Sequence, residues 1–131
     1  MTVINSIALF VAINLLVVGL SHLLQPKMWL SFFQLLTKKG LAGNTINALI
    51  HFGFGSLILS FHFIWSWPRL LITIYALLIT IKGIIYLLFP KIGLRNIALL
   101  TEKSISKFKW TGLIMTTLSV PVFYNLYRLS I

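Results

Sequence analysis

The side chains that carry acid–base, nucleophilic or metal chemistry in proteins are scarce in this chain. Its 131 residues include one acidic side chain, Glu102, three histidines and no cysteine. Glu102 stands in a basic stretch, so the sequence offers no carboxylate pair, no Ser/His/Asp triad and no carboxylate cluster for a metal ion. We therefore predict a protein that is not an enzyme and that holds no metal.

Two of the histidines could together bind a cofactor. His22 and His51 lie in apolar stretches that we expect to cross a membrane in opposite directions, and both fall in the half nearer the same membrane face. A haem could be bridged between them, because imidazole is a common axial ligand of haem iron. The alternative is that both are hydrogen-bonded interface residues, and under it we predict no cofactor.

Two other polar residues interrupt long apolar stretches. Lys82 lies eight residues before Pro90, which is about 12 Å along a helix of 1.5 Å rise per residue. No acidic residue lies in an apolar stretch to pair with it. Because a charge inside a membrane is costly, Lys82 either extends toward headgroups or binds an anionic lipid, a partner's carboxylate or a translocated anion. Asn14 is expected to make a hydrogen bond between helices.

The elements that carry these residues are predicted to be transmembrane helices. Hydrophobic residues make up 59% of the chain and charged residues only 9%, and both 1–26 and 40–68 contain no charge. A helix needs about 20 mostly apolar residues to cross a bilayer. Four stretches meet that need, at residues 3–24, 45–65, 70–89 and 110–127. Because these runs are continuously apolar rather than alternating, we predict an all-α, four-helix transmembrane domain over residues 1–131.

The two halves of the sequence resemble each other. Residues 19–50 align without a gap on 83–114, with 12 identities in 32 positions. The aligned identities include Gly19 with Gly83 and Pro26 with Pro90. We predict two tandem helical hairpins, about 1–66 and 67–131, that cross the membrane in parallel and each carry a short amphipathic interfacial helix.

The interfacial helix of the first half has an aromatic face. Trp29, Phe32, Phe33 and Leu36 are spaced i, i+3, i+4 and i+7, which places them on one side of a helix. In the second half only part of this apolar stripe remains. We expect the aromatic face to contact lipid or a partner protein.

The segment 19–29, GLSHLLQPKMW, followed by a glycine-rich second span with Gly53 and Gly55, resembles a family of small bacterial inner-membrane hairpin proteins of unknown function. The resemblance covers residues 1 to about 65 and, more faintly, 75–125. Members of that family have one hairpin, whereas this chain would hold two, and Gly93 stands where the second tryptophan would be. The resemblance implies a membrane hairpin fold and supplies no activity.

The basic residues are concentrated between the predicted spans. Eight of the eleven Lys and Arg residues fall in two connections: Lys27, Lys38, Lys39, Lys91, Arg95, Lys103, Lys107 and Lys109. The positive-inside rule places these connections in the cytoplasm and both termini outside, in a bacterial inner membrane or, alternatively, a mitochondrial one. We expect Lys27, Lys91 and Arg95 to contact anionic headgroups rather than nucleic acid.

Two functions fit this pattern. The first is a non-catalytic subunit or regulator of a larger membrane complex, which contacts anionic lipids and either other membrane-protein subunits or a second copy of itself. The second is a small transporter, channel or lipid-handling protein that acts as a homo-oligomer. The second requires Asn14, Thr80 and Lys82 to converge on a cavity, so the placement of these side chains distinguishes the two.

Overall fold

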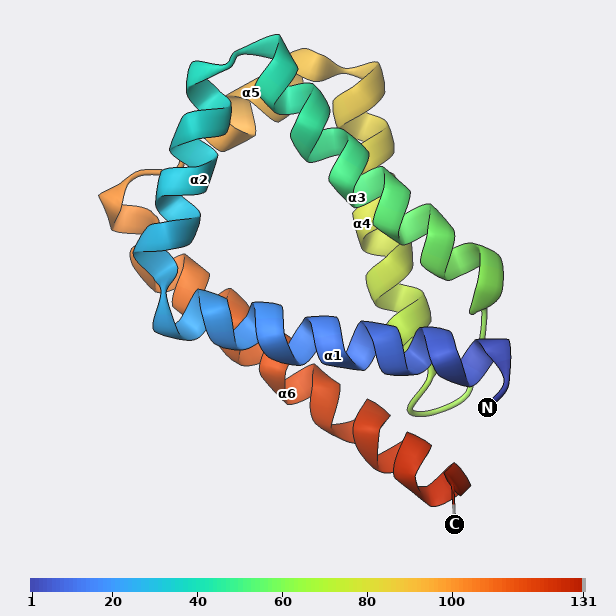
Figure 1. The fold of residues 1–131 in the computed structure, drawn as a ribbon. Helices are drawn as coiled ribbons and strands as arrows, with labels where there is room; N and C mark the ends of the chain where they lie inside the picture. Colours follow the sequence, from blue (N-terminus) through green and yellow to red (C-terminus); the bar gives the residue numbers. More distant parts are fainter. Residues whose placement is uncertain (131) are drawn as a thin grey trace.

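The computed structural model describes residues 1–130, which form six α-helices, one 3-10 helix and no strand (Figure 1). In chain order the elements are α1 (Val3–Leu24), α2 (Pro26–Lys38), α3 (Leu41–Phe61), α4 (Leu70–Leu88), α5 (Pro90–Ala98), η1 (Glu102–Ser104) and α6 (Ile105–Ser130). The prediction of an all-α chain is confirmed.

Three of the helices, α1, α3 and α4, are long and apolar enough to cross a membrane. The sequence prediction agrees with α1 and α4 but places α3 one turn too late, at 45–65. Gly40 has a φ of 57°, a conformation that glycine adopts readily, and it lets α3 begin directly after α2. At the other end Thr73 exchanges two hydrogen bonds with the backbone of Ile64, whose N–H donates at 3.0 Å and whose carbonyl accepts at 2.8 Å. The residues after Phe61 therefore belong to the connection.

The long helices associate across the two halves of the chain. Helix α1 packs along α6 and α3 packs along α4, whereas α1 and α3, the predicted partners of the first hairpin, touch each other little (Figure 1). Glycines explain the choice of partner. Gly19 lies against Thr116 of α6, and Gly83 lies against the backbone of Phe52 in α3, so closely that neither glycine has room for a Cβ atom. The two contacts are equivalent, because the offset that aligns Gly19 with Gly83 also aligns Phe52 with Thr116.

The two helix pairs meet at one end and spread apart at the other (Figure 1). An apolar cluster fills the meeting point, and its fully buried members come from four helices: Ala8, Val11, Ala12, Leu15, Ile58, Ile72, Ala76 and Val122. At the spread end α2 and α5 contact each other and bridge the pairs. Each of these short helices begins with a proline, which is well tolerated in a first helical turn because its missing N–H is not needed there.

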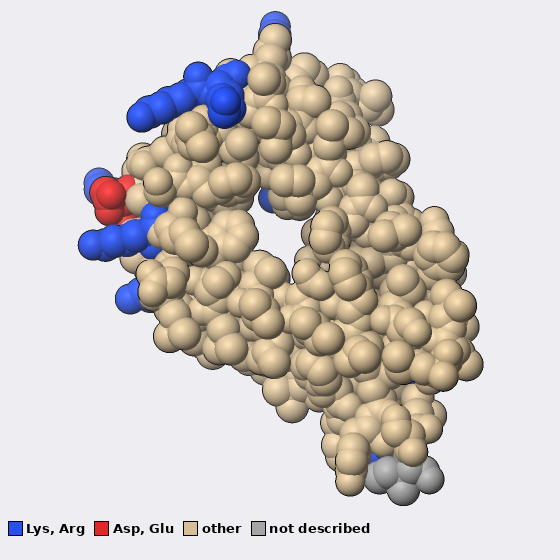
Figure 2. Space-filling model, viewed as in Figure 1, with Lys and Arg blue, Asp and Glu red and all other residues tan. Residues whose placement is uncertain are grey.

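Basic side chains gather at the spread end, over α2 and its surroundings (Figure 2). Helix α6 also begins there, and its 26 residues continue through Pro121 toward the meeting point. It is less apolar than α1, α3 and α4.

Candidate functional site

A cavity of about 650 Å³ lies between the two helix pairs and is lined by residues of all six α-helices. Figure 2 shows an opening that passes through the molecule between the pairs, with basic atoms at its rim. The volume falls within the roughly 300–1,000 Å³ of small-molecule sites. Among the helices that line it are α1, α3 and α4, the three that are long and apolar enough to span a bilayer.

The cavity wall is largely apolar and aromatic. Phe10 and Phe54 stack at 5.7 Å between ring centroids toward the meeting point of the helix pairs, and Phe33 and Phe108 stack at 5.9 Å at the spread end. The non-aromatic apolar lining residues are Val11, Val18, Ile50, Ile58, Ile79, Ile97, Leu100 and Met115. Such a surface suits a hydrocarbon chain.

Lys82 stands on this wall rather than on the lipid-facing side of α4. It is half-buried, and its Nζ lies 5.6 Å from the ring centroid of Tyr86, one helical turn further along α4. The chain's only acidic side chain, Glu102, is exposed in η1. The positive charge at the cavity therefore has no acidic side chain of this chain to neutralise it.

His22 and His51 also line the cavity, from α1 and α3. Each ring is fixed by a bond from Nδ1 to the carbonyl four residues earlier, at 2.8 Å to Val18 and 2.7 Å to Asn47. If Nδ1 carries the proton, Nε2 is left as an acceptor. His22 also stacks on Trp29, with centroids 4.1 Å apart. The structure thus places both predicted ligands at one cavity, and a haem between them stays a prediction.

Asn47 is a cavity residue that the sequence reasoning missed. It is 2% exposed, and its amide Nδ2 has no hydrogen-bond partner within residues 1–130. A buried donor left unpaired costs about 1–3 kcal/mol. An asparagine inside an apolar stretch is the signal that could have identified it, as it did Asn14.

Tyr86 is held in place by two asparagines. Asn44 donates from Nδ2 to the Tyr86 carbonyl at 3.0 Å, and Asn96 of α5 donates to the Tyr86 hydroxyl oxygen at 2.9 Å. Because the hydroxyl accepts a bond from Asn96, its own proton remains available to a molecule in the cavity.

Asn14 and Thr80 differ from their predicted roles. Asn14 lines the cavity, but its Nδ2 donates to the Phe10 carbonyl of its own helix at 2.8 Å, so it does not join two helices. Thr80 donates to the Ala76 carbonyl and packs against Gly55 in the α3–α4 contact, away from the cavity lining. Of the three residues expected on a pathway, Asn14 and Lys82 are brought together.

The aromatic face of α2 is directed into the cavity. Trp29, Phe32 and Phe33 all line it, and Trp29 donates from Nε1 to the Ser21 hydroxyl at 3.0 Å. The sequence predicted that this face contacts lipid or a partner. In the structure α2 lies across the spread ends of the helix pairs, and the same face closes the cavity. Lys27, Lys91 and Arg95 are exposed on α2 and α5 and do not line it.

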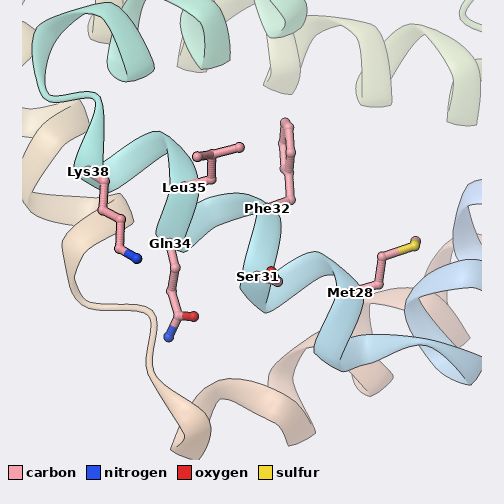
Figure 3. A pocket seen from close by; sticks show the side chains of 6 residues that line it. All are labelled: Met28, Ser31, Phe32, Gln34, Leu35 and Lys38. Atoms are coloured by element: carbon pink, nitrogen blue, oxygen red, sulfur yellow. The ribbon is translucent and has the colours of Figure 1, made fainter.

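The outer side of α2 carries a shallower groove of about 430 Å³ (Figure 3). Its lining residues are Met28, Ser31, Phe32, Gln34, Leu35 and Lys38. Figure 3 shows Gln34 and Lys38 on one side of the helix and Phe32 and Leu35 on the other. Met28 and Leu35 are exposed apolar side chains.

At the meeting point, Arg69 at the start of α4 forms hydrogen bonds to the other helix pair. Its guanidinium donates from Nη2 to Asn5 Oδ1 at 2.6 Å and from Nε to Asn125 Oδ1 at 3.1 Å. These bonds join the α3–α4 pair to both helices of the other pair. His62, in the adjacent connection, is fully buried. Burial lowers the pKa of His62 below its ordinary value, and the Arg69 charge acts in the same direction.

No family model matches this sequence, and comparisons with curated proteins and with solved structures found no match.

Proposed function

We propose that this chain is a four-span membrane protein that binds an amphiphilic small molecule between its two helix pairs, as a small transporter or lipid-handling protein without catalytic activity. The observation that carries the proposal is the convergence of Lys82, Asn47 and Tyr86 on an apolar cavity at membrane depth. A purely structural subunit would be expected to use such polar groups in helix contacts.

The proposal takes α6 as the fourth span. Its 26 residues correspond to about 39 Å of helix, more than the roughly 30 Å of a hydrocarbon core, and it packs along the apolar α1. Both termini then lie on the side opposite the basic α2 and α5. By the positive-inside rule that side is non-cytoplasmic, in a bacterial inner membrane or in a mitochondrial one.

The proposal also takes the chain as two copies of one unit. The offset that aligns Gly19 with Gly83 also aligns the last residues of α1 and α4, the first residues of α2 and α5, and the first residues of α3 and α6. The equivalent contacts of these two glycines support the same relation. In such a duplicate, Lys82 corresponds to Val18 and Tyr86 to His22, so the two walls of the cavity have diverged in polarity.

The opening through the molecule gives the amphiphile a route of entry. The opening passes between the helix pairs (Figure 2), so in the proposed four-span arrangement it faces the bilayer laterally rather than the aqueous phase. A lipid could slide in sideways and keep its tail in an apolar environment throughout.

Filling the cavity tests the proposal. The wild-type chain should be purified in a mild neutral detergent and its bound molecules identified by mass spectrometry. A Val18→Trp variant, which places an indole in the cavity, should lose the bound amphiphile, whereas Leu78→Trp, at a residue that is 64% exposed and outside the lining, should retain it. Equal retention by both variants would overturn the proposal.

A second candidate, a subunit or regulator of a larger complex, is favoured by the groove on the outer side of α2. Its exposed Met28 and Leu35 present apolar surface, and Lys38 lines the same groove. Under this candidate the same purification yields a stoichiometric partner protein, and a Leu35→Glu substitution releases it.

A further inference from the structure

Four polar residues of the cavity lie together on one wall. Asn47 and His51 lie one turn apart on α3, and Lys82 and Tyr86 lie one turn apart on α4; all four line the cavity. The α3–α4 pair is itself tightly packed. These residues therefore form one polar patch on a single rigid unit.

Three hydrogen-bond donors of this patch have no acceptor within residues 1–130. The Lys82 ammonium has no acidic side chain to pair with, the Asn47 amide nitrogen is buried without a partner in residues 1–130, and the Tyr86 hydroxyl accepts from Asn96 and keeps its proton. Donors that converge with one positive charge and no negative one are complementary to an anion. A cationic or neutral head group would leave the lysine charge uncompensated at membrane depth.

The facing wall is suited to the rest of an amphiphile. Phe10, Val11 and Val18 of α1 and Met115 of α6 line it together with the polar Asn14, His22 and Thr111, and the Phe10–Phe54 stack lies toward the meeting point of the helix pairs. A second basic residue, Lys107, lines the cavity from the first turn of α6. The apolar residues of this wall give the tail a surface apart from the patch on α3 and α4.

We infer that the ligand is an amphiphile with an anionic head group, a carboxylate or a phosphate, held by Lys82, Asn47 and Tyr86 with its hydrocarbon chain against the α1–α6 wall. The inference rests on the proposed function, since it specifies the molecule that the cavity binds. It assigns the head-group site to the α3–α4 pair.

The test uses the full chain in neutral detergent, with dissociation constants measured by native mass spectrometry. The probes are oleate and dioleoyl phosphatidic acid as anionic amphiphiles, oleyl alcohol as an uncharged amphiphile of the same chain length as oleate, and inorganic phosphate as a head group without a tail. We expect at least one anionic amphiphile to bind ten times or more tightly than oleyl alcohol, and inorganic phosphate to bind more weakly than either. The preferred anionic probe distinguishes a fatty acid from a phospholipid.

Variants separate the head-group site from the cavity as a whole. Lys82→Met, which keeps a long unbranched side chain, should weaken the anionic probe at least tenfold and leave oleyl alcohol within about twofold. Lys82→Arg should restore the preference for the anion, and Lys91→Met, at an exposed position outside the lining, should change nothing. Circular dichroism and gel filtration confirm that each variant is folded.

Two results would contradict the inference in distinguishable ways. If wild type and Lys82→Met bind oleate and oleyl alcohol equally, the cavity holds amphiphiles but selects no anion, so this inference fails and the proposed function stands. If no amphiphile binds to the wild-type chain, both fail.

Discussion

Two buried asparagines on α3 should respond in opposite ways to the same substitution. Asn44 and Asn47 are 1% and 2% exposed, and only Asn44 has a partner for its amide nitrogen, the Tyr86 carbonyl. Replacing Asn47 by leucine removes an unpaired buried donor, whose cost is about 1–3 kcal/mol. The same change at Asn44 also removes an unpaired buried acceptor, Oδ1, but it breaks a bond of about 1 kcal/mol and leaves the Tyr86 carbonyl without this partner. It further pushes added bulk toward Gly93, which already contacts the asparagine side chain.

We therefore expect Asn47→Leu to raise the free energy of unfolding of the ligand-free chain by about 1–3 kcal/mol, and Asn44→Leu to lower it by a similar amount. For a chain of this length each kcal/mol shifts the melting temperature by roughly 3–6 °C. Thermal unfolding in delipidating detergent, followed by circular dichroism, measures both. Adding the preferred amphiphile at a hundred times its dissociation constant should stabilise the wild type by about 2.7 kcal/mol and Asn47→Leu by much less.

The same two asparagine variants can also refute this reasoning. If Asn47→Leu destabilises the ligand-free chain as much as Asn44→Leu does, then Asn47 is satisfied within the fold and does not wait for a ligand. The head-group site would then lose one of its three donors.

Three further changes test the packing of α3 on α4 and the contacts at the meeting point of the helix pairs. Gly83→Val should destabilise the α3–α4 pair by about 1–3 kcal/mol because its side chain would meet the Phe52 backbone. Gly53→Ala should cause no such loss, because nothing lies close to Gly53. The denaturation midpoints of the two variants, compared with that of the wild type, measure the difference. Arg69→Ala should remove the hydrogen bonds between the helix pairs and lower the melting temperature by several degrees. Arg69→Lys should not restore the melting temperature, because the two bonds use separate guanidinium nitrogens. Full recovery with lysine would refute this. Burial lowers the pKa of His62 below its ordinary value of 6.5. As the pH falls below about 6.5, the histidine is therefore protonated in the unfolded chain before it is protonated in the folded chain. The free energy of unfolding should decrease between pH 7 and pH 5.5. His62→Leu should show a smaller decrease, and an identical pH profile would contradict the assignment.

Local elements follow from the sequence because their signals are local. Apolar runs bounded by Gln25-Pro26 and Phe89-Pro90 place the ends of α1 and α4, and proline at the first helical position places the starts of α2 and α5. The start of α3 was missed because it depends on the positive φ of Gly40, which hydropathy does not report.

The partners of the helices could not be predicted, since each apolar helix has several faces that suit lipid and protein equally. The pairing of α1 with α6 depends on where Gly19 meets Thr116, a contact between residues far apart in sequence. The cavity follows from that pairing. Lys82 and Asn14 could be singled out as polar groups in apolar runs, but their convergence with Asn47 depends on the spread of the two helix pairs.

The most direct test of the central claim is to identify what occupies the cavity in a native membrane. Benzoylphenylalanine should be placed at Phe54, which lines the cavity, and separately at Leu78, which does not, and the cross-linked products identified by mass spectrometry after irradiation of intact membranes. The account predicts that position 54 captures an anionic amphiphile far above its share of the membrane lipids, while position 78 captures lipids in proportion to their abundance. Identical lipid profiles at the two positions, or cross-links from position 54 to another protein alone, would contradict it.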